Sequence, residues 1–416
     1  MRIDPSHDRV PEPAPYSGSH GTPLENIVVA DFSRVLAGPL ATMTLADLGA
    51  TVIKIERPGS GDETRSWGPP WSAYGSTYHE SVNRSKQSIA LELTEPDDLA
   101  TATEIAARAD VVVENFTPGT MDRLGLGYTT VAARNPGVVY CSINGFGSRD
   151  GRDLLGYDFI LQAVGGLMSI TGAPDGEPAK VGVALVDVVT GKDAVIGILA
   201  AIEGRRRTGR GDRIEVSLLS SLLAALVNQG QASLETGVPA RRMGNQHPSI
   251  APYETLRCRD APIAVACGND GQFSRLVTVL GRPELATDPR FAGNAARVTH
   301  RPALRVELEQ RLATDDAQRW VERLTAARVP AGKVNTIPEA VDLAERLGLE
   351  PTVDVAEGWT RQVRHPVRWS GYRTAAVRPP PGLGADDRDV RDWLAAGPEV
   401  RATGHRKRAA GPEQEE

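Results

Sequence analysis

The sequence has little of several features that mark large classes of proteins. Cysteine occurs three times in 416 residues, as Cys141, Cys258 and Cys267, and an odd number at such wide spacings predicts neither a disulfide framework nor a CxxC metal site. No apolar run reaches the about 18 residues that a membrane-spanning helix requires. The formal net charge is −6, so no basic excess predicts a nucleic-acid partner. These absences favour a protein of the reducing cytoplasm that binds neither membrane nor nucleic acid and holds no metal.

Both ends of the chain have the composition of disordered tails. Residues 1–22 are rich in Pro, Gly, Ser and charged residues, and they lack the apolar stretch of a secretory signal. Residues 396–416 have a similar composition. We therefore expect the folded part of the chain to lie between these two tails.

Between the tails, apolar strand patterns alternate with helical patterns. Residues 26–32 and 51–56 are apolar runs typical of strands buried on both faces, and residues 40–48 between them have helical spacing and stop at Gly49. A strand, a helix and a second strand in this order predict a parallel sheet with a right-handed crossover. Further strands are predicted at residues 88–93, 110–116, 137–144 and 213–218. The alternation predicts a doubly wound, Rossmann-like α/β fold.

Polar or aromatic residues stand where several of these strands end, namely Arg34, Arg57, Asn115 with Phe116, and Asn144. In doubly wound folds, ligands bind beyond the carboxyl ends of the strands. The turn that follows the first strand contains one glycine and no GxGxxG fingerprint, which disfavours a dinucleotide-dependent dehydrogenase. The sequence therefore predicts a binding site for another ligand at this edge of the sheet.

Residues 180–209, KVGVALVDVVTGKDAVIGILAAIEGRRRTG, are predicted to form a strand, a turn and a long apolar helix, with Asp187 at the turn. Apolar residues flank Asp187 on both sides, and an ionisable group in such surroundings is costly unless it is paired or hydrogen-bonded. Buried carboxylates of this kind are candidates for functional sites. An aspartate that caps the helix is the other interpretation, and the pattern alone leaves both open.

The character of the sequence changes after about Gly230. We predict a large α/β domain over residues 23–230 and a small α+β domain over residues 231–345, which lies within the normal range of domain sizes. The segment over residues 346–395 is expected to return to the large domain.

Several motifs, taken in order over about residues 23–384, resemble the class III CoA-transferase family, also called the CaiB/BaiF or formyl-CoA transferase-like family. They are DFSRVLAGP, LGATVIKIERPGSGDETR, VNRSKQSIALEL, ADVVVENFTPGTMDRLGLGY, GYDFILQAVGGLMSITG, VGVALVDVVTG, and GNQHPSIAPYETL with CGNDGQF. The resemblance rests on their common order rather than on any one motif. It implies an interlocked homodimer in which two chains are threaded through each other.

The resemblance also implies a reaction. The family's nucleophile is an aspartate in the segment matched by VALVDVVTG, which assigns that role to Asp187. The enzyme would move CoA from an acyl-CoA donor, with succinyl-CoA as one candidate, to a carboxylic acid. The expected intermediates are an aspartyl anhydride and an aspartyl-CoA thioester, which places the enzyme in class EC 2.8.3. No cofactor would be tightly bound, because the coenzyme A thioester is a substrate.

The same matching implies binding residues. The expected CoA-binding residues are Leu36, Ala37, Arg57, Leu91, Asn115, Phe116, Arg123 and Tyr157. The expected substrate loop consists of Gly268, Asn269, Asp270 and Gly271. Without the resemblance, the apolar members would be read as core packing and the arginines as surface residues.

Two other functions remain open. An α-methylacyl-CoA racemase of the same fold would use Asp187 together with a histidine, but the chain has Tyr157 where that histidine is expected. The unperturbed tyrosine pKa of about 10 makes it a poor general base at neutral pH. A racemase would also need a carboxylate near the GNDGQF motif, and Asp270 is available there. A non-catalytic CoA-binding protein is the other alternative, and the intact Asp187 argues against it.

Overall fold

The computed structural model describes residues 20–397 of the chain. Within that range it divides into two compact units, and the first contains residues 20–165, 182–230 and 350–397. The second contains residues 166–181 and 231–349. The predicted tails lie largely outside the described residues. Of their described members, His20 forms a parallel bridge with Tyr372, so the predicted tail over residues 1–22 extends too far.

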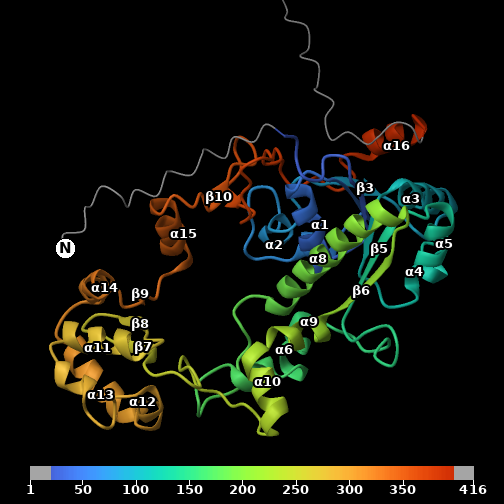
Figure 1. The fold of residues 1–416 in the computed structure, drawn as a ribbon. Helices are drawn as coiled ribbons and strands as arrows, with labels where there is room; N and C mark the ends of the chain where they lie inside the picture. Colours follow the sequence, from blue (N-terminus) through green and yellow to red (C-terminus); the bar gives the residue numbers. More distant parts are fainter. Residues whose placement is uncertain (1–19, 398–416) are drawn as a thin grey trace, which may run out of the picture. The chain divides into compact units, whose positions relative to one another are not determined.

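The first unit is built on a six-stranded sheet in the order β3-β2-β1-β4-β5-β6 (Figure 1). Its strands are β1 (Val28–Asp31), β2 (Thr51–Glu56), β3 (Gln87–Ala90), β4 (Val111–Glu114), β5 (Val139–Asn144) and β6 (Arg213–Ser217). All neighbouring pairs are parallel. The chain order reverses between β1 and β4, which is the point where doubly wound folds bind ligands. The predicted α/β fold is therefore confirmed.

Helices cover both faces of this sheet (Figure 1). On one face α1 packs against α8, and on the other Ala102, Ile105 and Ala106 of α3 join a core with strand residues such as Val28 and Ile53. The helices of the first unit are α1 (Ala37–Asp47), α2 (Thr77–Glu80), α3 (Pro96–Arg108), α4 (Thr120–Arg123), α5 (Tyr128–Arg134), α6 (Asp158–Val164), α8 (Leu185–Thr208), α9 (Leu218–Ala225) and α16 (Asp387–Ala395), with the short helix η1 (Glu63–Ser66). The helix α10 (Val227–Thr236) runs across the boundary between the units.

The C-terminal part of the first unit contains a separate two-stranded hairpin and a helix that binds the edge of the six-stranded sheet. The hairpin pairs β10 (Thr352–Val353) with β11 (Gln362–Val363) in antiparallel fashion. Asp386 and Asp387, at the start of α16, accept hydrogen bonds from the backbone N–H groups of Ser88 and Ala90. These acids bind the edge strand β3 at backbone groups that would otherwise be exposed, and the positive end of the helix dipole favours their charge there.

The second unit has its own sheet and core. The antiparallel sheet consists of β7 (Tyr253–Arg257), β8 (Pro262–Ala266) and β9 (Ala331–Lys333). Its helices are α7 (Leu167–Ile170), α11 (Asp270–Val279), α12 (Asn294–Thr299), α13 (Arg301–Leu312), α14 (Ala317–Ala326) and α15 (Ile337–Arg346), with η2 (Pro283–Ala286). Ile263, Val265, Phe273 and Trp320 lie in one buried cluster, so this unit is stabilised by a core separate from that of the first.

Two expectations about the chain between α6 and α8 are wrong. Residues 166–181 were assigned to the large domain but belong to the second unit, because Gly172 and Ala173 accept hydrogen bonds from Gly244 and Arg242. The strand expected before Asp187 does not form. Val183 is largely exposed, and the position beside β5 in the sheet is occupied by β6.

Among residues 20–397, no helix combines the length and the hydropathy that crossing a membrane requires.

Candidate active site

Asp187 lies in the first turn of α8, where its carboxylate is buried. The helix begins at Leu185 and its N-cap residue is Ala184, which makes no side-chain capping bond. The interpretation of Asp187 as the helix cap is therefore wrong. The side chain is 9 % exposed, and no residue between 20 and 397 gives its carboxylate a hydrogen bond or an ion pair. A buried carboxylate without such a partner is poorly stabilised in its charged form.

The residue that caps α8 is Asp158, the first residue of α6. Its Oδ1 accepts the backbone N–H groups of Val186 at 2.8 Å and Asp187 at 3.3 Å. Its Oδ2 accepts from Gln162 Nε2 at 2.7 Å, one turn further along α6. Two helices are thus joined at their N-terminal ends, and the first turn of α8 is held in place by a carboxylate that is distant in sequence.

This arrangement changes the acidity of Asp187. Burial first, and the negative charge of Asp158 second, raise the pKa of the Asp187 carboxyl from 3.8 to about 7. The group is therefore divided between its neutral and ionised forms at neutral pH, and the ionised form is weakly solvated. A carboxylate of that kind is a stronger base and a stronger nucleophile than one in water.

Tyr78 of α2 is the second group in this electrostatic environment. Its side chain is half-buried, and burial together with the charges of Asp187 and Asp158 raises the pKa of Tyr78 to about 12. The hydroxyl therefore keeps its proton at neutral pH and is available as a hydrogen-bond donor. Neither Tyr78 nor a role for Asp158 was predicted from the sequence. The GYD motif signalled Asp158, but no local pattern indicated Tyr78.

The two predicted CoA-binding residues at the start of α1 lie beside the helix that carries Asp187. Gly191 is four residues after Asp187 and so lies on the same side of α8. A Cβ atom at Gly191 would lie 2.7 Å from the carbonyl oxygen of Ala37, so only glycine permits this approach of α8 to α1. Ala37 is buried, and Leu36 is the half-buried N-cap residue of α1.

The loops that follow β1 and β4 are joined at the predicted ligand edge of the sheet. Asn115 accepts the Arg34 backbone N–H at 2.8 Å and donates to the Arg34 carbonyl oxygen at 2.7 Å. The Arg34 guanidinium lies 5.0 Å above the ring centroid of Phe116 and pairs with Glu63 at 3.0 Å. Asn115, in the loop after β4, thus fixes the backbone of the loop after β1.

A buried network of charges supports these loops from below. Lys54 on β2 pairs with Asp62 at 3.1 Å and donates to the Ser33 carbonyl oxygen at 2.7 Å. Lys86 pairs with Asp31, at the end of β1, at 3.0 Å. Although burial raises the pKa of Asp31, the positive charges of Lys86 and Lys54 outweigh it and hold that pKa below its usual value. All four charges are inaccessible to water, so each depends on its partner.

The other predicted CoA-binding residues differ in accessibility. Leu91 is 1 % exposed within the core of the first unit, where it packs as a plain core residue. Arg57 and Arg123 are exposed, with Arg57 3.4 Å from Glu92 and Arg123 bonded to Thr120. Tyr157 is exposed and immediately precedes α6, next to Asp158. The side chains of the two arginines and Tyr157 are therefore accessible to a ligand, whereas the side chain of Leu91 is not.

The predicted substrate loop lies in the second unit, at the start of α11. The Asn269 side chain caps this helix by accepting from the Gln272 backbone N–H at 2.9 Å. The backbone N–H of Gly268 donates to Gln272 Oε1 at 2.7 Å. Asp270 pairs at 2.6 Å with Arg297, whose guanidinium is completely buried. The Asp270 carboxylate therefore has a structural partner within the second unit.

Comparison with known protein families identifies the family of this chain. The model of CoA-transferase family III matches residues 24–387. The chain belongs to this family. It is therefore a CoA-transferase, an enzyme of class EC 2.8.3.

Individual relatives extend over nearly the whole chain. A succinate–glutarate CoA-transferase of Agrobacterium fabrum is 42 % identical over 383 residues, which cover 88 % of this chain and 94 % of the relative. An acetyl-CoA:oxalate CoA-transferase of Acetobacter aceti is 40 % identical over 382 residues, with 91 % and 97 % covered. A CaiB/BaiF family protein of Brucella suis has a solved structure with a TM-score of 0.82 and 40 % identity. That comparison covers 90 % of this chain and all of the solved one.

Proposed function

We propose that the enzyme transfers CoA from an acyl-CoA donor to a carboxylic acid through covalent intermediates on Asp187. The observation that carries this proposal is the buried carboxylate in the first turn of α8, whose pKa is raised to about 7. Its weak solvation favours attack on a thioester carbonyl, and covalent catalysis divides the exchange into easier steps.

In each proposed step, one bond to an acyl carbon forms and another breaks. An Asp187 oxygen attacks the acyl carbon of the donor, the carbon–sulfur bond breaks, and CoA leaves as a thiolate. The thiolate attacks the Asp187 carbonyl of the resulting anhydride, which releases the donor acid and leaves an aspartyl-CoA thioester. The acceptor carboxylate then attacks this thioester and frees the thiolate again. Attack of the thiolate on the acceptor carbonyl yields the new acyl-CoA and restores the Asp187 carboxylate.

Other residues are proposed to assist these steps. Asp158 holds the first turn of α8 and keeps the Asp187 pKa high. The protonated Tyr78 hydroxyl is suited to stabilise a developing oxyanion. The exposed guanidinium groups of Arg57 and Arg123 are suited to CoA phosphates, because their planar donors match phosphate oxygens.

The remaining predicted CoA-binding residues, Leu36, Ala37, Asn115, Phe116 and Tyr157, are proposed to border the rest of the CoA site. Leu91 is left with a packing role. Gly268 to Gly271 remain the proposed substrate loop.

The substrates are proposed from the relatives. The enzyme of Agrobacterium fabrum is named for succinate and glutarate, and that of Acetobacter aceti for acetyl-CoA and oxalate. We therefore propose succinyl-CoA as the donor and a short dicarboxylic acid as the acceptor.

The quaternary structure is also a proposal. Several apolar side chains between residues 154 and 164 are exposed, among them Leu155 at 79 % and Val164 at 62 %. An exposed apolar patch of this kind marks an interaction surface. We expect a homodimer, interlocked as the resemblance implies and located in the cytoplasm. Light scattering coupled to size exclusion would measure its mass.

Intact-mass analysis tests the proposed reaction. The protein is mixed with a panel of acyl-CoAs and treated with hydroxylamine or borohydride. We expect an adduct with succinyl-CoA that is absent from Asp187→Ala and retained by Glu203→Gln, which removes an exposed acid from the same helix. Exchange of an α-proton into deuterated water without any adduct would instead establish a racemase. CoA binding without adduct or exchange would establish a non-catalytic binding protein.

A further inference from the structure

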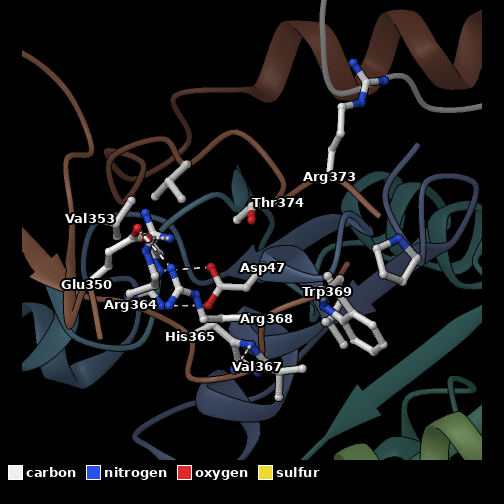
Figure 2. A pocket seen from close by; sticks show the side chains of 14 residues that line it. Asp47, Glu350, Val353, Arg364, His365, Val367, Arg368, Trp369, Arg373 and Thr374 are labelled. Carbon is white, nitrogen blue, oxygen red and sulfur yellow. Dashed lines mark hydrogen bonds and ion pairs between the residues drawn. The ribbon is translucent and has the colours of Figure 1, made fainter. Parts of the chain in front are cut away.

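A cavity of about 380 Å³ lies at the end of α1 that is remote from the predicted CoA-binding residues. Asp47 and Leu48 form one side of it, and the β10–β11 hairpin with the segment after it forms the other (Figure 2). Ala37 and Asp47 are the two ends of α1, and a helix of this length spans about 15 Å. The cavity is therefore separate from the edge of the sheet where Leu36, Ala37 and Asn115 lie.

Positive charge exceeds negative charge in the lining of this cavity. Its charged residues are Arg84, Arg364, Arg368 and Arg373, against Asp47 and Glu350. Burial lowers the pKa of the neighbouring His365, so the imidazole stays neutral near pH 7. The lining thus carries a net positive charge.

The arginines of the lining differ in how completely a carboxylate of the protein pairs with them. Arg84 and Asp47 pair through both carboxylate oxygens, at 2.9 and 2.6 Å, and both side chains are buried. In contrast, Glu350 is shared between Arg364 and Arg368, at 2.9 Å from each (Figure 2). The Glu350 carboxylate therefore does not satisfy every donor of the Arg364 guanidinium.

Two observations indicate such an oxyanion. Arg364 Nε is buried and has no hydrogen-bond acceptor among residues 20–397. A buried donor without an acceptor destabilises the folded protein, and an oxygen of a ligand would relieve that cost. The guanidinium of Arg373 forms no ion pair with any described residue, and its labelled side chain points away from the Glu350 cluster in Figure 2.

The rest of the lining defines the kind of anion. Leu48, Val353, Val367, Val377 and Trp369 give the cavity apolar walls. Its volume lies at the lower end of the range for small-molecule sites, about 300–1,000 Å³. These walls suit a ligand that carries a short carbon skeleton as well as its charged group.

We propose that this cavity is a second ligand site, which binds a small organic anion through a carboxylate or phosphate group held by Arg364, while Arg373 adds positive charge to the lining. The site is distinct from Asp187 and its occupancy does not depend on the transfer reaction.

Calorimetric titration of the full-length protein tests this proposal. The probes are glutarate, a dicarboxylate, and glycerol 3-phosphate, a phosphate monoester, each with and without saturating CoA. We expect one probe to bind with a Kd below about 1 mM and CoA to leave that Kd unchanged. The probe that binds distinguishes a carboxylate from a phosphate ligand. Asp187→Ala should bind it equally well, which separates this site from the proposed reaction.

Variants of the lining complete the test. Arg364→Met should weaken binding about tenfold, the effect of losing one hydrogen bond to a charged group. Arg373→Gln should weaken it about threefold and tests the site even if Arg364→Met does not fold, because Arg373 has no ion pair within residues 20–397 to lose. Arg388→Gln, whose side chain is 92 % exposed on α16, is the control and should bind normally. Absence of saturable binding, displacement by CoA, or an unchanged Kd in both lining variants would overturn the proposal.

Discussion

Replacing Asp187 by asparagine should stabilise the protein, and the gain should grow with pH. In the folded protein the pKa of Asp187 is raised from 3.8 to about 7. Between these values the unfolded chain ionises first, so the folded wild type loses stability as pH rises through this window. One pKa unit corresponds to about 1.4 kcal/mol, so the full cost above the window is at most about 4 kcal/mol.

Two effects refine this value. The positive end of the α8 dipole favours the carboxylate by about 0.5–1 kcal/mol, which an amide does not recover. Asparagine preserves the shape of the side chain, so no cavity term is added. We therefore expect Asp187→Asn to exceed the wild type by about 3 kcal/mol near pH 8 and to match it near pH 4.

Urea unfolding at fixed protein concentration would measure this difference at several pH values, since association would otherwise add to the apparent stability. Glu203→Gln controls for the loss of one negative charge from the same helix. A gain that is independent of pH, or that shrinks as pH rises, would contradict the burial of an ionisable Asp187. An equal gain in Glu203→Gln would attribute the effect to net charge instead.

Three further substitutions probe the surroundings of the site. Asp158→Asn keeps an oxygen for the α8 backbone but removes the charge that raises the Asp187 pKa, so the acid limb of the kcat/KM profile should move to lower pH. Asn115→Ala breaks both bonds to the Arg34 backbone and should raise the KM for acyl-CoA about tenfold with little change in kcat, as steady-state kinetics would measure. Lys86→Met leaves Asp31 buried with one cation fewer and should lower the free energy of unfolding in urea by about 3 kcal/mol, and Asp31→Asn in the same chain should restore part of it.

Local patterns predicted the regular elements of the fold well where the elements are strongly periodic. The strand over residues 51–56 has the predicted bounds. The first strand was predicted over residues 26–32 and is shorter, Val28–Asp31, because its ends depend on where β2 and β4 provide partners. Strand ends are set by neighbours distant in sequence, which no local pattern contains.

The segment before Asp187 shows the same limit more clearly. An apolar run such as VGVAL is compatible with a buried strand or with an exposed approach to a helix. The segment before Asp187 does not form a strand in this sheet, because β6, which comes later in the chain, pairs with β5. The assignment of residues 166–181 to the second unit likewise depends on hydrogen bonds from the Arg242 side chain and the Gly244 backbone N–H, more than sixty residues away.

At the candidate site, the sequence predicted that Asp187 is a functional residue, but it did not predict which residues surround Asp187. The apolar flanks of Asp187 predicted burial, and the side chain is buried. Capping of α8 by Asp187 was one of two interpretations that the pattern left open, and Asp158 supplies the cap from another helix. The effect of the Asp187 charge on the pKa of Tyr78 could not be predicted from local sequence either, because α2 and α8 are more than a hundred residues apart in the chain.

The acidities around Asp187 bear on which chemistry the site can support. Racemisation requires two groups that exchange a proton with carbon near neutral pH, and their pKa values must lie near the working pH. Asp187, with a pKa of about 7, meets this condition, but Tyr78, with a pKa of about 12, does not lose its proton there. Asp270 is committed to Arg297 within the second unit. One ionisable carboxylate with a neutral hydrogen-bond donor in its electrostatic environment instead suits the proposed nucleophilic attack on a thioester, since the attack creates an oxyanion that a donor can stabilise.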